Sequence, residues 1–138
     1  MNYDINISEI PEVQELQALF SQTTWASKRE NSDVEKLLKY MTVYVSIREN
    51  DQLIGFGRAL SDGVYRALIE DIVVDEAYRK KGLGRVIVEQ LIIQLNEIDE
   101  VYLNTGPHLE EFYNKFGFKK SDAFSMKLKQ KDDDSNSL

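Results

Sequence analysis

The sequence predicts a mixed α/β (α+β) fold in which helices flank a mostly antiparallel central sheet. Segments with alternating apolar residues, typical of strands, are interleaved with segments whose apolar residues recur every three or four positions, typical of helices. Three strands in succession predict an antiparallel meander. The strand, helix and strand that follow predict a parallel pair, because a crossover connection joins strands of the same direction. We expect about four helices, which is enough to cover both faces of such a sheet.

The N-terminal part predicts one strand and two helices. Residues 3–7 alternate as a short strand does, and Pro11 suits the first turn of a helix whose apolar positions lie within residues 13–20. Ser32 and Glu35 have the spacing of a capping box, so we expect a second helix to begin there.

The middle of the chain predicts three consecutive strands. Residues 42–48 and 52–60 form a hairpin around the turn residues Asn50 and Asp51. Residues 64–74 follow as a long apolar run, which is typical of a central strand covered on both faces. We then expect a loop at 75–83.

The C-terminal part adds a helix at 84–98, a short strand at 101–104 and a fourth helix at 109–116. Gly117 suits the left-handed position that ends such a helix. We expect a final strand at 125–129.

A single domain over residues 1–130 follows from the length of 138 residues and from the absence of repeats or linkers. Residues 131–138 are polar and acidic, and we expect this tail to be disordered because it has little apolar surface to bury.

Composition excludes several classes of function. Seventeen Lys and Arg against 24 Asp and Glu give a net charge of −7, so we expect no nucleic-acid partner. The chain has no cysteine and a single histidine, His108, which argues against thiolate chemistry and a multi-histidine metal site. It has no long apolar run, and its first residues lack a basic segment, so we expect a cytoplasmic protein without membrane contact.

The segment Arg79–Gly84, Arg-Lys-Lys-Gly-Leu-Gly, predicts an anion site. It lies between a strand and a helix, where glycines let backbone amides face one point and where the helix dipole favours negative charge. Neither a Walker A loop nor a dinucleotide fingerprint fits, because Arg85 and Ile87 stand where these motifs require other residues.

The sequence resembles the GNAT superfamily of acetyl-CoA-dependent N-acetyltransferases, and within it small bacterial members. That family's Arg/Gln-x-x-Gly-x-Gly/Ala loop is matched by Arg79, Gly82 and Gly84. Its second signature is matched by Phe112-Tyr113-Asn-Lys-Phe-Gly-Phe118. The sequence departs from the family at Gly106, where many members carry an asparagine.

The resemblance implies that acetyl-CoA is the cosubstrate and that the parallel strands splay around it, with no metal. The residues that it assigns to the cosubstrate are Ile72, Val73, Val74, Arg79, Lys80, Lys81, Gly82, Leu83, Gly84, Arg85, Asn104 and Tyr113. A backbone N–H near residues 72–74 would stabilise the oxyanion, and Tyr113 would protonate the departing sulfur. Tyr113 is equally explained as part of the apolar stripe of its helix.

Acetylation of an amine near neutral pH requires a base, because alkylammonium groups have pKa values of about 10.4. Glu70 and Asp71 are the carboxylates inside the long strand. A regular strand presents only one of two successive residues to a given side, but the resemblance implies a bulge that re-aims either. The alternative is that one of them pairs with a lysine or caps a turn.

These observations predict direct transfer of an acetyl group to a primary amine of a small molecule, either a simple amine or an aminosugar. Trp25 lies where the family builds the acceptor wall, so we expect Trp25 and Glu70 to contact the acceptor, although Trp25 also suits packing between two helices. A peptide amine as acceptor and a non-catalytic acyl-CoA-binding module are the alternatives. Exposed strand edges allow a homodimer.

Overall fold

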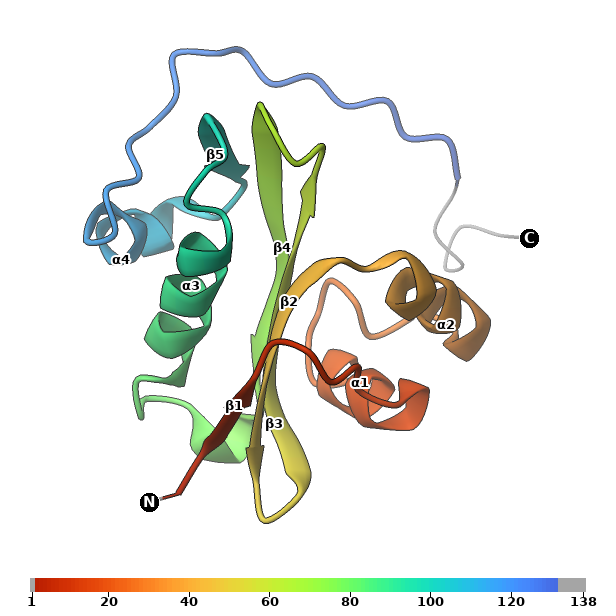
Figure 1. Cartoon of the computed structure of the whole chain (residues 1–138). Helices are drawn as coiled ribbons and strands as arrows, with labels where there is room; N and C mark the ends of the chain where they lie inside the picture. Colours follow the sequence, from red (N-terminus) through yellow and green to blue (C-terminus); the bar gives the residue numbers. More distant parts are fainter. Residues whose placement is uncertain (1, 132–138) are drawn as a thin grey trace. The chain divides into compact units, whose positions relative to one another are not determined.

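A computed structural model describes residues 2–131 of the chain (Figure 1). The chain divides into two compact units, Met1–Asn104 and Thr105–Leu138, each of which is described by itself. Most of the expected acidic tail lies outside the described residues, and the single domain over residues 1–130 stays a prediction.

The first unit is built on a five-stranded sheet in the order β1-β2-β3-β4-β5. The first four strands pair antiparallel with their neighbours, and β5 pairs parallel with β4, which confirms the predicted mixed sheet. The strands are β1 (Asp4–Asn6), β2 (Val43–Glu49), β3 (Gln52–Ser61), β4 (Arg66–Val74) and β5 (Glu100–Leu103). Each expected strand of this unit is therefore present, with its ends shifted by a few residues.

The hairpin between β2 and β3 forms as predicted. Asn50 and Asp51 both adopt positive φ angles, 49° and 65°. Two successive left-handed residues are the signature of the hairpin turn whose twist matches that of the strands, and Asn and Asp tolerate this conformation better than other side chains do.

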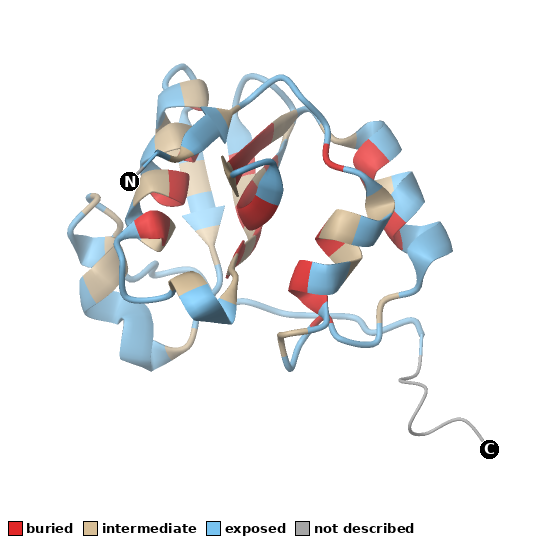
Figure 2. Ribbon diagram, turned by 90° about the horizontal axis from the view of Figure 1, so that it is seen from below, coloured by how far each residue is buried: buried red, intermediate tan, exposed pale blue. Residues whose placement is uncertain are grey.

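Two helices, α1 (Val13–Phe20) and α2 (Asn31–Tyr40), cover one face of the sheet (Figure 1). Buried and exposed segments alternate along these ribbons in Figure 2, as expected for helices with one apolar face. The core beneath them joins Leu16, Phe20 and Val34 to Phe56 of the sheet.

The capping box expected at Ser32 is wrong. Helix α2 begins one residue earlier, and its N-cap is Glu30 in an extended conformation. The backbone amides of Asp33 and Val34 both donate to the Glu30 carbonyl at 3.0 Å. The start of the helix is therefore set by the loop that precedes it and not by a side-chain cap.

Helix α3 (Leu83–Gln94) covers the opposite face and ends before the predicted residue 98. Its close approach depends on Gly57 of β3, where a built Cβ would lie only 2.5 Å from Cγ2 of Ile87. A side chain at residue 57 would push the helix away from the sheet. Ahead of α3, the loop contains the 3-10 turn η1 (Glu76–Tyr78).

The second unit holds the 3-10 turn η2 (Pro107–Leu109) and the short helix α4 (Glu110–Asn114). Gly117 has a φ of 98°, as expected for a residue that ends a helical segment. The final strand expected at 125–129 is wrong: no strand forms there, and Phe124, Met126 and Leu128 are 89%, 86% and 82% exposed. Alternation alone does not make a strand, because a strand also needs a neighbour to accept its hydrogen bonds.

Candidate active site

The loop before α3 has the geometry that the sequence predicts for an anion site. Gly82 is the N-cap of this twelve-residue helix and has a φ of 83°, and Lys80 has a φ of 64°. Among residues 2–131, the backbone amides of Gly82, Leu83, Gly84 and Arg85 find no acceptor. A built Cβ on Gly82 meets no atom within 4 Å, so the space beside this N-cap residue is open. Unpaired amides at a helix N-terminus attract anions.

The cationic side chains of this loop are exposed, and they differ in their partners. Arg79 Nε donates to the Val74 carbonyl at 3.3 Å, while Lys81 Nζ lies 5.4 Å from the ring centre of Tyr78. Arg85 Nε pairs with Glu89 at 2.9 Å, the expected contact between residues four apart on a helix.

Strand β4 contains a bulge next to Glu70. Arg58 of β3 faces Glu70, but Phe56 faces Val73, so two residues of β4, Asp71 and Ile72, lie opposite Gly57 and one of them is extra. Asp71 at the bulge has a φ of 57°, which is rare for a residue with a side chain. Bulges re-aim side chains that a regular pleat would send to opposite faces.

Asp71 is held by two arginines and is 6% exposed. Arg29 donates to both of its carboxylate oxygens at 3.0 Å, and Arg58 Nε donates to Oδ2 at 2.7 Å. Burial alone raises the pKa of the Asp71 carboxyl, but the hydrogen bonds and charges of the two arginines outweigh it and hold the pKa below its ordinary value. A carboxylate stabilised in this way is a weak base. One carboxylate is therefore ion-paired, as the alternative interpretation allowed, but its partners are arginines and not a lysine.

Glu70 has the opposite character. Its side chain is half-buried, and among residues 2–131 it makes no hydrogen bond or ion pair. Burial and the neighbouring charge of Asp71 raise the pKa of the Glu70 carboxyl, while Arg58 and Arg29 oppose the shift. A free carboxylate with a raised pKa suits proton abstraction better than an ordinary surface glutamate does.

The pairing of the parallel strands β4 and β5 ends beside Glu70. The β4–β5 pairing ends where Ile69 faces Leu103, so Glu70 and Asn104 are the first residues beyond it on their strands. From Glu70 to Val74, strand β4 has no strand neighbour on that side among the described residues. The backbone of residues 72–74 therefore lies in the part of β4 whose β5 edge is open.

Trp25 lies in the loop between α1 and α2 and is 54% exposed. Its ring packs at a tilt against Phe20, and the Arg29 guanidinium lies 5.7 Å from the centre of the Trp25 ring. Because Arg29 also binds Asp71, the exposed tryptophan is connected to the bulge through one side chain. Trp25 can therefore pack against Phe20 and also contact an acceptor, since about half of the residue is exposed.

In the second unit, Tyr113 lies in α4 and packs edge-on against Phe112 and Phe118, with ring centres 4.9 and 6.0 Å away. Burial raises the pKa of the Tyr113 hydroxyl. A built Cβ on Gly106 would lie 2.7 Å from the His108 ring. The asparagine common in the family would therefore displace His108 from its present position.

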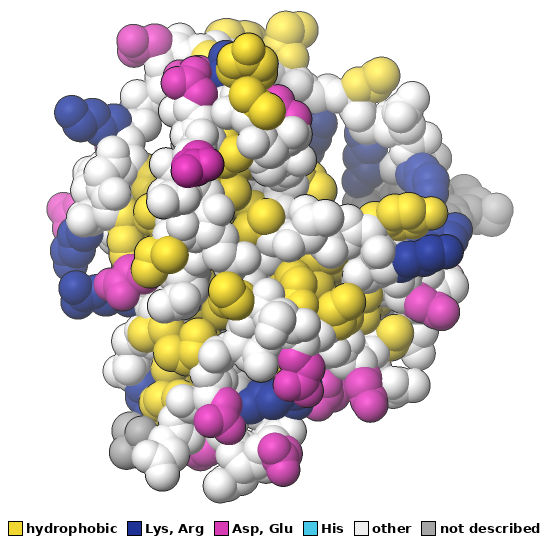
Figure 3. Space-filling model, viewed as in Figure 1, with side chains coloured by type: hydrophobic (Ala, Val, Ile, Leu, Met, Phe, Trp, Pro, Cys, Tyr) yellow, Lys and Arg dark blue, Asp and Glu magenta, His cyan; other side chains and the backbone are white. Residues whose placement is uncertain are grey.

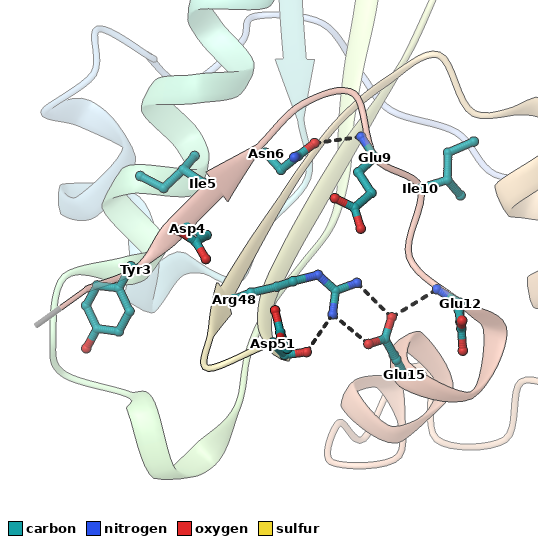
Figure 4. Close-up of a pocket in the computed structure, with 10 residues that line it drawn as sticks. All are labelled: Tyr3, Asp4, Ile5, Asn6, Glu9, Ile10, Glu12, Glu15, Arg48 and Asp51. Atoms are coloured by element: carbon teal, nitrogen blue, oxygen red, sulfur yellow. Dashed lines mark hydrogen bonds and ion pairs between the residues drawn. The ribbon is translucent and has the colours of Figure 1, made fainter.

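A separate pocket of about 630 Å³ lies at the β1 end of the sheet (Figure 4). Arg48 crosses it and binds both carboxylate oxygens of Glu15 and the Asp51 carbonyl. None of the predicted site residues lines this pocket, which is rich in carboxylates. It is a different surface from the bulge and the glycine loop.

The sequence pointed to Glu70 and Asp71 but not to the two arginines that distinguish them. Arg58 was within reach, because it lies in the predicted hairpin partner and faces Glu70 in the observed register. Arg29 comes from an irregular loop and gives no periodic signal.

No group of acidic or histidine side chains suited to a metal ion occurs within residues 2–131. In the same range, no helix has the length and apolar character needed to cross a membrane.

Known proteins share this sequence pattern. A 110-residue stretch is 38% identical to an uncharacterized N-acetyltransferase, ycf52, of Porphyra purpurea, and covers 75% of this chain and 63% of that protein. A histone acetyltransferase, TAP1, of Glycine max is 32% identical over 120 residues, which cover 78% of this chain and 52% of that protein. The chain thus spans about half to two thirds of the length of these relatives.

The fold is also shared. A Staphylococcus aureus protein of unknown function, described as a probable acetyltransferase, superimposes with a TM-score of 0.81 at 26% identity. The match covers 94% of this chain and all of that one. The sequence model of the acetyltransferase (GNAT) family matches residues 10–118, from the start of the first helix to the end of the aromatic signature. The chain therefore belongs to the acetyltransferase (GNAT) family.

Proposed function

We propose that the protein transfers an acetyl group from acetyl-CoA directly to a primary amine of a small molecule. The observation that carries this proposal is Glu70, a half-buried carboxylate with a raised pKa and with no side-chain partner among residues 2–131, at the point where the β4–β5 pairing ends. Family membership supports the reaction class. The bulge and the glycine loop support the placement of the two substrates.

The glycine loop would hold the diphosphate of acetyl-CoA. Among residues 2–131 the four backbone amides from Gly82 to Arg85 have no acceptor, and Arg79, Lys80 and Lys81 add positive charge in an acidic chain. Asn104 and the open edge of β4 at residues 72–74 supply polar groups beside the separated strands. The residues present therefore fit a long anionic ligand that ends between β4 and β5.

Glu70 would remove the proton from the ammonium group of the acceptor, directly or through a water molecule. The neutral amine nitrogen then attacks the thioester carbonyl, and a backbone N–H near Ile72–Val74 stabilises the oxyanion. As the tetrahedral intermediate collapses, the nitrogen releases its second proton to water, the C–S bond breaks and the electron pair leaves with the sulfur. Tyr113, kept protonated by its raised pKa, is the group that we assign to return a proton to that sulfur. Asp71 is assigned a positioning role, because both of its oxygens already accept hydrogen bonds.

An amine of a protein is the second candidate acceptor, because the Glycine max relative is called a histone acetyltransferase. A third reading is an acyl-CoA-binding protein without turnover. The two alternatives differ from the main proposal in measurable ways. An acetyltransferase of protein amines would prefer lysine peptides. An acyl-CoA-binding protein would bind acetyl-CoA without forming product. We keep the cytoplasm and the homodimer as predictions.

The test combines calorimetric titration of acetyl-CoA with an assay of coenzyme A release over a panel of primary amines. We expect acetyl-CoA to bind, and Glu70→Gln to lower kcat by about 10²–10⁴ without weakening that binding. Glu35→Gln, an exposed position on α2, is the matched control. Binding without release of coenzyme A from any amine or lysine peptide contradicts the enzymatic proposal.

A further inference from the structure

An apolar groove lies on the sheet face that carries Glu70. Its volume is about 650 Å³, and it is open to solvent. Its lining comes from the end of β3, the start of β4 and one residue of β5, and consists of Leu60, Ser61, Asp62, Arg66, Ala67, Leu68 and Tyr102. All of these residues belong to the first unit.

The register of the sheet places the groove directly beside Glu70. Leu68 lies two residues before Glu70 on β4, ahead of the bulge, so both side chains are on the same face. Leu68 faces Leu60 on β3 and Tyr102 on β5. These three side chains form a row across the sheet, about 7 Å along β4 from Glu70.

The charged groups at the groove have partners within the protein, and Asp62 uses its Oδ1 oxygen for them. The Asp62 carboxylate accepts hydrogen bonds from the backbone amides of Val64, Tyr65 and Arg66 at 2.8, 2.8 and 3.2 Å. Arg66 pairs with Glu100 at 3.1 Å and with Asp99 at 3.7 Å. The surface left for a ligand is therefore apolar: Leu60 is 53% exposed and Tyr102 is 38% exposed.

We infer that this groove binds the apolar body of the acceptor, so that the substrate is an alkyl or arylalkyl primary amine. The inference rests on the proposed function, because it takes Glu70 as the point where the amine reacts. A spacer of about two carbon atoms places a ring over Leu68 when the amine nitrogen is at Glu70, given the pitch of about 3.3 Å per strand residue.

The same surface selects against the other acceptors under consideration. The hydroxyls of an aminosugar would lose water against Leu60 and Leu68 without gaining hydrogen bonds, which is unfavourable. A second ammonium group, as in a polyamine, would lose water against the row of Leu60, Leu68 and Tyr102 without gaining a hydrogen bond from these side chains. The groove thus narrows the acceptor class from any small amine to an apolar one.

The test compares kcat/KM for 2-phenylethylamine, ethylamine, glucosamine 6-phosphate, spermidine and a lysine peptide. We expect 2-phenylethylamine to exceed ethylamine by about tenfold or more, since filling an apolar pocket with several carbon atoms has an effect of at least that size. Leu60→Ser should raise KM for 2-phenylethylamine by about tenfold and leave ethylamine unchanged. Ile93→Ser is the matched control, an equally exposed apolar residue on α3 over the opposite face.

The outcomes separate this inference from the proposed function. Equal kcat/KM for ethylamine and 2-phenylethylamine, or a preference for the sugar, spermidine or the peptide, overturns the inference and leaves acetyl transfer standing. Coenzyme A release from none of the amines overturns both. Light scattering could also show a dimer that Leu60→Ser dissociates, with the amine preference unchanged. That result assigns the groove to a second copy of the chain and also overturns the inference.

Discussion

Arg29 donates two hydrogen bonds of 3.0 Å to the two carboxylate oxygens of Asp71, across 42 residues of sequence. Planar two-point pairing of this kind fixes both partners in orientation as well as in distance. It connects the loop that carries Trp25 to the bulge that carries Glu70. Trp25, the proposed acceptor contact, and Glu70, the proposed base, are therefore linked through one ion pair.

Asp71→Asn is expected to destabilise the protein by about 3–5 kcal/mol, because it leaves Arg29 and Arg58 without their buried anion. The pKa of Asp71 is lowered in the folded state, so its contribution is present above the ordinary aspartate pKa and is lost as pH falls through the folded pKa. Urea unfolding at neutral and acidic pH measures this. Wild type should lose stability on acidification and Asp71→Asn should lose less; equal losses would show that the pair does not matter. Glu35→Gln is expected to change stability by less than about 0.5 kcal/mol.

Gly82→Ala is expected to reduce acetyl-CoA affinity at least about tenfold, because its Cβ would project into the open space before the amides of the loop. Gly63→Ala is a matched control, since Gly63 has a φ of 84°, close to the 83° of Gly82, and a built Cβ likewise meets no atom within 4 Å. Both variants should lose about 1 kcal/mol of unfolding free energy. Calorimetry separates them, and an equal loss of affinity in both would contradict a specific role of the loop.

Trp25→Ala is expected to raise KM for the acceptor roughly three- to tenfold with little change in kcat, because an exposed aromatic ring contributes contact area and no proton transfer. Trp25 is the only tryptophan in the chain, so its fluorescence reports directly on this position. Titration with a saturating amine should change the emission of wild type. Unchanged emission together with an unchanged KM in the variant would assign Trp25 to packing against Phe20.

Tyr113→Phe is expected to lower turnover by no more than about 10²–10⁴, because a thiol with a pKa of about 8.5 leaves fairly easily without an acid. Acetyl-CoA binding should persist, since the ring contacts with Phe112 and Phe118 need no hydroxyl. Full activity of the variant across the pH range would return Tyr113 to a packing role. Phe112→Leu controls for a general loosening of the aromatic cluster.

Much of the architecture followed from local patterns. The hairpin around Asn50 and the helix that packs on Gly57 depend on periodicity and turn chemistry, both of which are written in neighbouring residues. The start of α2 did not follow, because Glu30 caps the helix through its backbone carbonyl, which any residue could supply and which leaves no side-chain signal. The segment at 125–129 did not follow, because a strand depends on a partner distant in sequence, and the alternation of Phe124 and Met126 does not show whether that partner is there.

The candidate site divides in the same way. The glycine loop was visible because helix N-termini that bind anions have a local sequence signature. The sequence did not show that Asp71 would be ion-paired and Glu70 would not, because this depends on an arginine from the α1–α2 loop and on the register at the bulge. Two adjacent carboxylates in a sequence do not show which one will be neutralised by partners.

The most direct test of the account is the pH dependence of kcat/KM for wild type and Glu70→Gln with one alkylamine. If Glu70 is the base, the deficit of the variant is largest near neutral pH and shrinks as pH approaches the amine pKa of about 10.4, where the free amine no longer needs a base. On the acidic side, kcat/KM of wild type should fall with an apparent pKa above the ordinary glutamate value, because the pKa of Glu70 is raised. A deficit that stays constant with pH, or no deficit at all, would contradict the role of Glu70.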